Sequence, residues 1–258
     1  MKILEVNNLI KTFKDPNNNN FRVLNDINFS LSRGEVLGLV GESGSGKTTL
    51  GRTIIRLTNQ DSGKIIFDNH DISNLSKSVM KKIRRDMQII FQDPFGSLNP
   101  RHSIAHIIGE PLIIHNFGSY DKIKKRVLQL LDQVGLPSDS MKLYPHEFSG
   151  GQRQRIAIAR AIALKPKFLI ADEAVSALDV SIQSQILNLI SDLVKEYNIS
   201  MVFISHDLSV IRHISSSIAI MQKGEIVEMG NTETVLKQPK HKYTKKLISA
   251  VPGFQSNF

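Results

Sequence analysis

The stretch of sequence that decides the fold reads Val36-Leu37-Gly38-Leu39-Val40-Gly41-Glu42-Ser43-Gly44-Ser45-Gly46-Lys47-Thr48-Thr49. Its first five residues form a continuous apolar run, which predicts a strand buried on both faces. The residues that follow it, from Leu50 to Leu57, have the spacing of a helix. The stretch therefore predicts a buried strand, a glycine-rich turn and a helix in direct succession.

The turn matches the phosphate-loop pattern G-x-x-x-x-G-K-[ST], and it lies between a strand and a helix as that pattern requires. Glycines let backbone N–H groups close around phosphates, and the helix adds the positive end of its dipole. Lys47 is expected to reach the β- and γ-phosphates of a nucleotide, and the Thr48 hydroxyl to ligate Mg²⁺. A turn needed only for chain reversal would not require this Lys-Thr pair. The predicted nucleotide contacts are Gly41, Glu42, Ser43, Gly44, Ser45, Gly46, Lys47, Thr48 and Thr49.

A second apolar run ends in two adjacent acids and reads Phe168-Leu169-Ile170-Ala171-Asp172-Glu173. As a buried strand it would deliver both acids to the carboxyl edge of the sheet, where ligands bind in open α/β folds. Asp172 is expected to act on Mg²⁺ through water, and Glu173 to be the general base toward the attacking water. Two acids at a strand end more often cap a helix than form a catalytic pair. Only the phosphate loop upstream favours the catalytic interpretation here.

The rest of the chain predicts an α/β core interrupted by helices. Residues 3–9 and 23–31 alternate as half-buried strands around a turn-rich loop at 15–20, whereas residues 101–164 have mainly helical spacing. Further strands are predicted at 167–171, 200–204, 217–221 and 225–229, with helices at 182–197 and 207–214. We expect one domain with a core at 1–100 and 165–235, a helical subdomain at 101–164 and a C-terminal tail at 236–258.

Composition excludes several classes of protein. The 258 residues include no cysteine, so disulfide frameworks and thiolate metal sites are excluded. The start, Met1–Val6, contains an acidic residue and is followed by polar ones where a signal peptide needs a long apolar run. No stretch approaches the about 20 apolar residues of a membrane span. The net charge of +9 would suit nucleic acid or an anionic membrane face, but much of it follows solvated helix faces such as 77–85. We expect the chain to stay inside the cell and any membrane role to be peripheral.

A third motif separates this chain from kinases, GTPases and helicases, which share the first two. The residues Phe148-Ser149-Gly150-Gly151-Gln152-Arg153-Gln154-Arg155 precede a predicted helix and resemble the ABC signature L-S-G-G-Q, with Phe148 in place of Leu. Serine and two glycines at a helix N-terminus make a second anion site. The resemblance implies a head-to-tail dimer, in which Ser149, Gly150, Gly151 and Gln152 meet ATP held by the partner.

Other positions resemble the same family in the same order. Gln92 resembles the glutamine that touches Mg²⁺ and water, residues 176–179 resemble the D-loop, and His206 resembles the switch histidine that bonds the γ-phosphate. Phe13 resembles the aromatic that stacks on adenine, with Phe21 as a competitor. The family commonly has Pro where Ala174 stands, a change that removes a rigid turn but no functional group. The resemblance implies the ABC ATPase fold: a P-loop NTPase (RecA-like) core, an N-terminal antiparallel β subdomain and an inserted α-helical signature subdomain.

Longer matches point to one branch of the family. Residues 144–155 and 175–181 resemble oligopeptide, dipeptide and nickel importers, as does the tail His241-Lys242-Tyr243-Thr244-Lys245-Lys246-Leu247 except at Lys242. The resemblance implies an ATPase using ATP and Mg²⁺, with peptide as first substrate and nickel or a metal chelate as second. It also implies a second, non-identical ATPase, two transmembrane permease subunits, an extracytoplasmic substrate-binding protein acting indirectly, and a place on the cytoplasmic face of the membrane.

The rival interpretation is a soluble ABC protein acting on ribosomes or DNA. The chain has one copy of the motifs, and about 125 residues separate Lys47 from Asp172, too few for a long coiled coil beside the helical segment. We therefore expect no nucleic-acid partner. His102 and His106 have a metal-ligand spacing, but we expect no metal there because no acidic or third ligand is foreseen beside them. His146-Glu147 lacks the second histidine of H-E-x-x-H.

Overall fold

The computed structural model describes residues 1–15 and 18–250. Residues 16–17 of the predicted loop and 251–258 of the predicted tail therefore lie outside the described residues. The chain forms two compact units: unit 1 contains Met1–Met80 and the chain from Ser200 onward, and unit 2 contains Lys81–Ile199. The division into a core, a helical subdomain and a tail at the boundaries given above stays a prediction.

Unit 1 begins with an antiparallel sheet in the strand order β2-β1-β4-β5. Its strands are β1 (Lys2–Lys14), β2 (Asn20–Ser32), β4 (Ser62–Phe67) and β5 (His70–Asp71). The alternation predicted at 3–9 and 23–31 is confirmed: Leu4, Val6 and Leu9 are buried, and polar residues separate them. β4 and β5 were not foreseen: Gly63, within β4, has a positive φ angle, and β4 is held as a strand by pairing with β1 and β5.

Unit 1 also contains the strand order β10-β9-β3-β8. β3 (Val36–Val40) pairs in parallel with β8 (Ser200–Ser205) and β9 (Ser217–Gln222), and β10 (Glu225–Asn231) is antiparallel to β9. Residues 37–40 of β3 are all buried, as expected for a strand whose two faces are both covered, and this explains why its apolar run is continuous. Val40 lies opposite Ser205 in the register, so β3 and β8 end at the same edge of the sheet.

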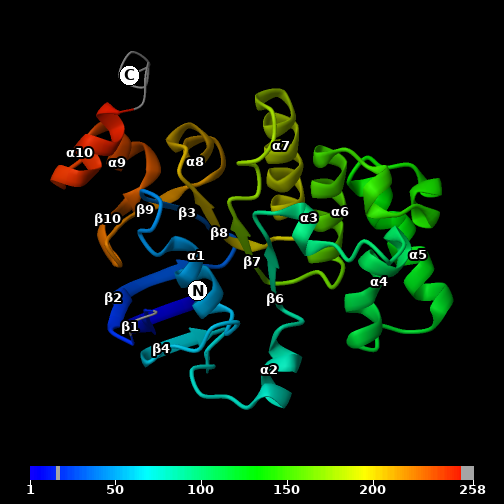
Figure 1. Ribbon diagram of the computed structural model, residues 1–258, viewed down its shortest axis with the longest axis horizontal. Helices are drawn as coiled ribbons and strands as arrows, with labels where there is room; N and C mark the ends of the chain where they lie inside the picture. The colour runs from blue at the N-terminus through cyan, green and yellow to red at the C-terminus, as the bar shows by residue number, and fades with distance from the viewer. Residues whose placement is uncertain (16–17, 251–258) are drawn as a thin grey trace. The chain divides into compact units, whose positions relative to one another are not determined.

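The helices of unit 1 follow these strands. They are α1 (Lys47–Ile54), α8 (Leu208–Ile214), α9 (Thr232–Lys237) and α10 (Lys242–Ser249). α8 packs so closely on β3 that a Cβ at Gly38 would lie 2.4 Å from the Ile211 side chain. Figure 1 shows α9 and α10, in orange and red, beside β9 and β10. The C-terminal helices thus belong to the same unit as the phosphate loop.

Unit 2 contains a parallel pair of strands and most of the helices. α2 (Lys77–Ile83) carries the chain from unit 1 into unit 2, where β6 (Met87–Ile90) pairs with β7 (Phe168–Asp172). The helices are α3 (Pro94–Ser97), α4 (Ile104–Ile114), α5 (Tyr120–Gln133), α6 (Gly150–Ile162) and α7 (Val180–Glu196), with 3-10 turns at Ser138–Lys142 and Pro145–Glu147. The helical character predicted for residues 101–164 is confirmed, and its apolar positions, such as Leu130 and Ile158, are buried.

Among the helices that lie within residues 1–15 and 18–250, none combines the length and the apolar character needed to cross a membrane.

Candidate functional site

The phosphate loop has a backbone that only glycine adopts without strain. Gly44 and Gly46 have φ angles of 79° and 103°, in the left-handed region. A Cβ at Gly41 would lie 2.1 Å from the Met221 carbonyl oxygen, so no side chain fits there either. Gly46 is the N-cap of α1, and with no side chain it leaves the helix N-terminus turned toward the loop without a side-chain cap. The loop is therefore shaped for an anion that supplies this cap.

Lys47 folds back across the loop that precedes it. Its ammonium donates to the carbonyl oxygen of Gly41 at 2.8 Å and to that of Glu42 at 2.9 Å. The side chain is 5% exposed, so the positive charge is held at the start of α1 rather than in solvent. The helix dipole and the ammonium thus place positive charge at the same point.

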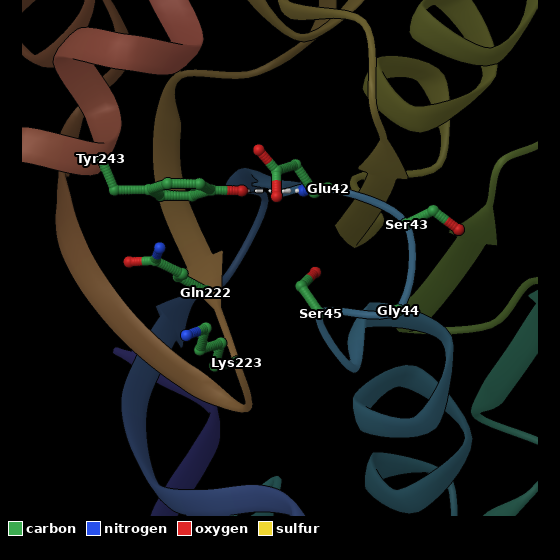
Figure 2. A pocket seen from close by; sticks show the side chains of 7 residues that line it. All are labelled: Glu42, Ser43, Gly44, Ser45, Gln222, Lys223 and Tyr243. Carbon is green, nitrogen blue, oxygen red and sulfur yellow. Dashed lines mark hydrogen bonds between the residues drawn. The ribbon is translucent and has the colours of Figure 1, made fainter.

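The apex of the loop faces outward and borders a pocket. Glu42, Ser43 and Gly44 are exposed, Ser45 is buried, and Thr48 and Thr49 are partly exposed. Figure 2 shows the pocket, whose lining comes from the loop, from the β9–β10 turn and from α10. The lining residues are Glu42, Ser43, Gly44, Ser45, Gln222, Lys223 and Tyr243. The Tyr243 hydroxyl accepts a hydrogen bond from the Glu42 N–H at 2.9 Å, a contact that the sequence did not suggest.

His206 lies at the same sheet edge as the phosphate loop. It follows Ser205, the last residue of β8, which is the register partner of Val40 at the end of β3. The next residue, Asp207, caps α8 by accepting from the Ser209 N–H at 2.8 Å. The His206 side chain is exposed. Unit 1 therefore brings two of the predicted site elements to one edge.

In unit 2 the acids at the end of β7 differ in burial. Asp172 is 2% exposed, whereas Glu173 is half-buried and has a φ angle of 47°. Such a backbone is uncommon for a residue with a side chain and is often found at functional sites. The Ser176 hydroxyl donates to the Glu173 carbonyl at 3.0 Å, which holds this turn. Ala174 is buried, so the position where the family has proline is packed in the interior.

Gln92 contacts the carboxylate of Glu173. The Gln92 amide nitrogen donates to Glu173 Oε2 at 2.9 Å, so two of the candidate catalytic residues, 81 positions apart, are in contact. Gln92 lies two residues beyond the end of β6, which pairs with β7. Adjacent parallel strands place their carboxyl ends together, and this explains the contact.

The signature loop caps its own helix. Ser149 is the N-cap of α6: its hydroxyl accepts from the Gln152 N–H at 3.3 Å, and Gln152 Oε1 accepts from the Ser149 N–H at 3.0 Å. A Cβ at Gly150 would lie 3.6 Å from Leu178 in the predicted D-loop, whereas one at Gly151 would lie 2.6 Å from Ile182. The signature loop and the segment 176–179 are therefore neighbours in unit 2.

The two candidate adenine contacts lie opposite each other. Phe13 on β1 and Phe21 on β2 are register partners, and such pairs lie side by side on one face of an antiparallel sheet. Their exposed fractions are 42% and 62%, so both rings are accessible. The Lys11 ammonium lies 5.2 Å from the centre of the Phe13 ring. The choice of Phe13 over Phe21 stays a prediction.

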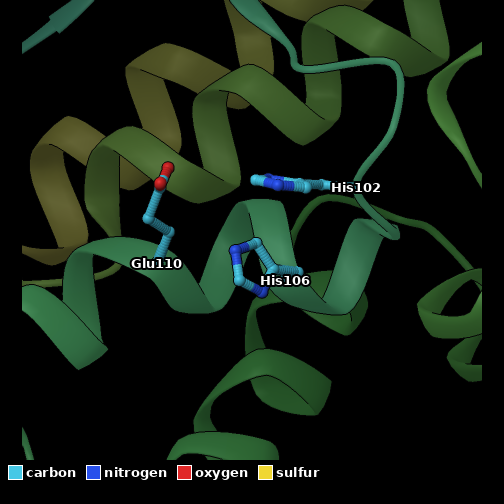
Figure 3. Close-up of side chains that lie close together, drawn as sticks. All are labelled: His102, His106 and Glu110. Carbon is cyan, nitrogen blue, oxygen red and sulfur yellow. The ribbon is translucent and has the colours of Figure 1, made fainter.

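The interpretation of the two histidines needs a correction. Figure 3 shows Glu110, one helical turn beyond His106 on α4, beside His106 and His102. One ligand atom from each of the three lies within 4.8 Å of the others, so the expectation that no acidic or third ligand accompanies the histidines is wrong. Burial lowers the pKa of the Arg160 guanidinium, and the negative charge of Glu110 opposes this shift.

Two family models match the chain. The model described as ABC transporter covers residues 24–176, and the model described as oligopeptide/dipeptide transporter, C-terminal region, covers residues 227–257. Glutathione import ATP-binding protein GsiA of Salmonella typhimurium is 54% identical over 88% of this chain. The chain spans only 36% of the length of that relative. A putative peptide import ATP-binding protein of Brucella ovis is 49% identical over 90% of this chain and 73% of its own length.

Solved structures have the same fold. The dimeric cassette MJ0796, bound to ADP and Pi, has a TM-score of 0.81 at 31% identity, covering 89% of this chain and 98% of that one. CbiO1 from Clostridium perfringens has a TM-score of 0.80 at 29% identity, covering 97% of this chain and 96% of that one. The predicted ABC ATPase fold is confirmed by these likenesses and by the mixture of antiparallel and parallel strands.

Proposed function

Because the chain belongs to the ABC transporter family, we propose that it binds and hydrolyses ATP to power the import of di- and oligopeptides. The observation that carries the proposal is the phosphate loop. Its glycine backbone, its uncapped helix start and its buried ammonium form one anion-binding cradle. The contact between Gln92 and Glu173 supports hydrolysis in addition to binding.

The loop residues suit a triphosphate with Mg²⁺. Gly41 through Thr49 would bind the phosphates, with the Lys47 ammonium oriented by the loop carbonyls and donating to phosphate oxygens. The oxygen atoms of Thr48, Asp172 and Gln92 form a donor set of the kind that Mg²⁺ prefers, and we propose them as its protein contacts. Mg²⁺ supplies positive charge that offsets the charge of the phosphates during transfer.

For hydrolysis we propose Glu173 as the general base, taking the proton from the attacking water. Its carboxylate is oriented by the amide of Gln92, and the turn that carries it is fixed by Ser176. His206 would bond the γ-phosphate from the end of β8, and Phe13 would stack on adenine. The half-buried position of Glu173 leaves its carboxylate accessible to water.

The signature loop would serve an ATP held by another chain. We propose that Ser149, Gly150, Gly151 and Gln152 complete the site of a second, non-identical ABC ATPase in a head-to-tail dimer. The solved structure of MJ0796 is that of a dimer, which supports this arrangement. The dimer would act on two transmembrane permease subunits at the cytoplasmic face of the membrane, and a substrate-binding protein outside would act indirectly.

The C-terminal region supports peptide as the substrate class. It matches the oligopeptide/dipeptide transporter C-terminal region, and relatives of this chain are named for peptide or glutathione import. Glutathione is itself a small peptide, so these names agree on one class. Two alternatives remain to be distinguished by experiment. One is import of nickel or a metal chelate, and the other is action on ribosomes or DNA.

The test is to isolate the chain with its co-purifying subunits and to measure ATP hydrolysis in proteoliposomes with a dipeptide, glutathione or Ni²⁺. We expect two polytopic subunits to co-purify, and peptide with its binding protein to raise hydrolysis. The same preparation with Lys47→Ala in this chain should lose that stimulation. Stimulation by Ni²⁺ alone would contradict the peptide assignment, and co-purification with ribosomes or DNA would contradict the transporter assignment.

A further inference from the structure

The C-terminal helix reaches the phosphate loop through one side chain. Tyr243 lies in the first turn of α10 and is 6% exposed. Its hydroxyl accepts a hydrogen bond from the Glu42 N–H at 2.9 Å, across 201 positions of sequence (Figure 2). The rest of the pocket separates the tyrosine from the other loop residues. This hydroxyl is therefore the point at which α10 holds the loop.

The bonded N–H belongs to the same peptide unit that Lys47 binds. The carbonyl of Gly41 and the N–H of Glu42 are the two polar ends of one planar peptide, and in a trans peptide they point in opposite directions. The carbonyl end accepts from the Lys47 ammonium at 2.8 Å, and the N–H end donates to Tyr243 at 2.9 Å. The peptide is thus held on one side by the ammonium and on the other by the phenol.

Contacts on both sides of Tyr243 fix the start of α10. His241 is the N-cap, and its Nδ1 accepts from the Tyr243 N–H at 3.2 Å. The Glu228 carboxylate on β10 accepts from the N–H groups of Lys240 at 2.8 Å and His241 at 3.0 Å. Burial raises the pKa of Glu228, but its hydrogen bonds outweigh this and hold the pKa below its usual range. The carboxylate that anchors the helix therefore stays charged.

The phenol is suited to a neutral, permanent contact. Burial raises the pKa of Tyr243 above its usual value, with a smaller opposing contribution from the Glu42 N–H bond. The hydroxyl therefore stays protonated across the physiological range. Its oxygen lone pairs accept from a backbone donor without bringing negative charge toward a loop that has to bind phosphates.

We infer that Tyr243 is a positioning residue for Lys47: by holding the Gly41–Glu42 peptide from the opposite side, it fixes the carbonyl that orients the ammonium. The C-terminal helix then sets the nucleotide affinity of the phosphate loop. The inference rests on the proposed binding of nucleotide at this loop. Tyr243 itself touches no reacting atom.

The expected effect is that of one hydrogen bond between neutral groups. Tyr243→Phe removes the acceptor and keeps the ring, so the Kd for a non-hydrolysable ATP analogue with Mg²⁺ should rise about 2- to 10-fold. The kcat of the assembled transporter at saturating ATP should stay unchanged. Tyr120→Phe is the matched control, because Tyr120 is 78% exposed at the start of α5.

The experiment measures analogue binding by calorimetry and backbone amide exchange by NMR in the full chain, for wild type and both variants. We expect the Glu42 amide to exchange faster only in Tyr243→Phe, while the amides of α10 from Lys245 onward stay protected. Wild-type exchange at Glu42 or a wild-type Kd in Tyr243→Phe would overturn the inference. Faster exchange throughout α10 would overturn it too, because the hydroxyl would then only hold the helix.

The design separates this inference from the proposed function. If the wild-type chain binds no nucleotide, the proposed function fails whatever happens at Tyr243. If wild type binds the analogue and Tyr243→Phe retains either the wild-type affinity or the wild-type protection of the Glu42 amide, the function stands and the positioning role is wrong.

Discussion

Helices α1 and α6 both begin directly after a glycine-containing loop, but only α6 has a side-chain cap at its N-terminus. At α1 the N-cap is Gly46, which has no side chain, and the ammonium of Lys47 is held against the loop. At α6 the N-cap is Ser149, whose capping box with Gln152 satisfies a donor on each residue within the chain.

The difference indicates which loop depends on a ligand. An anion stabilises the backbone N–H groups at the start of a helix, and a buried ammonium beside them attracts an anion further. A capped helix is complete without a ligand, and any phosphate near it would meet the remaining N–H groups of the glycines. The phosphate loop is thus suited to hold ATP for its own chain, and the signature loop to meet an ATP that arrives on another.

The largest effect is expected for a substitution outside both loops, which should change ATP hydrolysis but not ATP binding. Glu173→Gln keeps the shape of the side chain but cannot take the proton from water, so ATP turnover at this chain's own site should fall about 10²- to 10⁴-fold. Nucleotide binding should persist, because Glu173 belongs to neither loop. Steady-state hydrolysis and calorimetry on the isolated chain, where the partner's site contributes no turnover, check both statements. Turnover near that of wild type would assign the base to another residue, with His206 tested next.

A smaller effect is expected at the phosphate loop itself. Lys47→Ala removes charge-assisted hydrogen bonds to phosphate, so the Kd for MgATP should rise about 10- to 100-fold in the isolated chain. Lys125→Ala, which removes an exposed lysine from α5, is the control and should bind as wild type does. Calorimetry provides the measurement. Equal affinity of the two variants for MgATP would contradict the conclusion that the phosphate loop holds the ATP of its own chain.

Replacing a glycine by alanine should lower the free energy of unfolding more in the phosphate loop than in the signature loop. Gly41→Ala places a Cβ 2.1 Å from the Met221 carbonyl oxygen, and overpacking of this kind costs about 1 to 3 kcal/mol. Gly150→Ala meets only Leu178 at 3.6 Å, an ordinary contact, and should change the free energy of unfolding by less than about 0.5 kcal/mol. Urea denaturation of both variants provides the measurement. A greater loss of stability at Gly150 would contradict the packing described for both loops.

Much of the fold could be predicted because local pattern and tertiary context agree. The runs at 36–40 and 168–171 are apolar because side chains on both faces of these strands are buried, and β3 and β7 lie where they were expected. The hairpin of β9 and β10 was also foreseen from the Lys223-Gly224 turn, where both residues have positive φ angles. β4 was missed because only its pairing with β1 makes it a strand.

Sequence motifs indicated candidate site residues where a motif is continuous, but they did not indicate which distant residues would meet. The contact of Gln92 with Glu173 agrees with the family resemblance, but spacing alone would not have given it. Tyr243 was noted only as part of the tail that resembles the importers, and no local pattern indicated that it would reach Glu42. Glu110 is different: it stands four residues after His106, so the sequence did carry the signal that was overlooked.

The most direct test of the central claim replaces Gly150 with Asp, which puts a carboxylate where the partner's γ-phosphate would approach. Nucleotide binding is measured on the isolated mutant chain, and hydrolysis is measured in the assembled pair. In the pair, this chain also carries Glu173→Gln, so that only the partner's site turns over. We predict normal binding by the isolated chain and loss of turnover at the partner's site. Loss of binding in the isolated chain would mean that the signature loop acts on its own ATP, and would contradict the account.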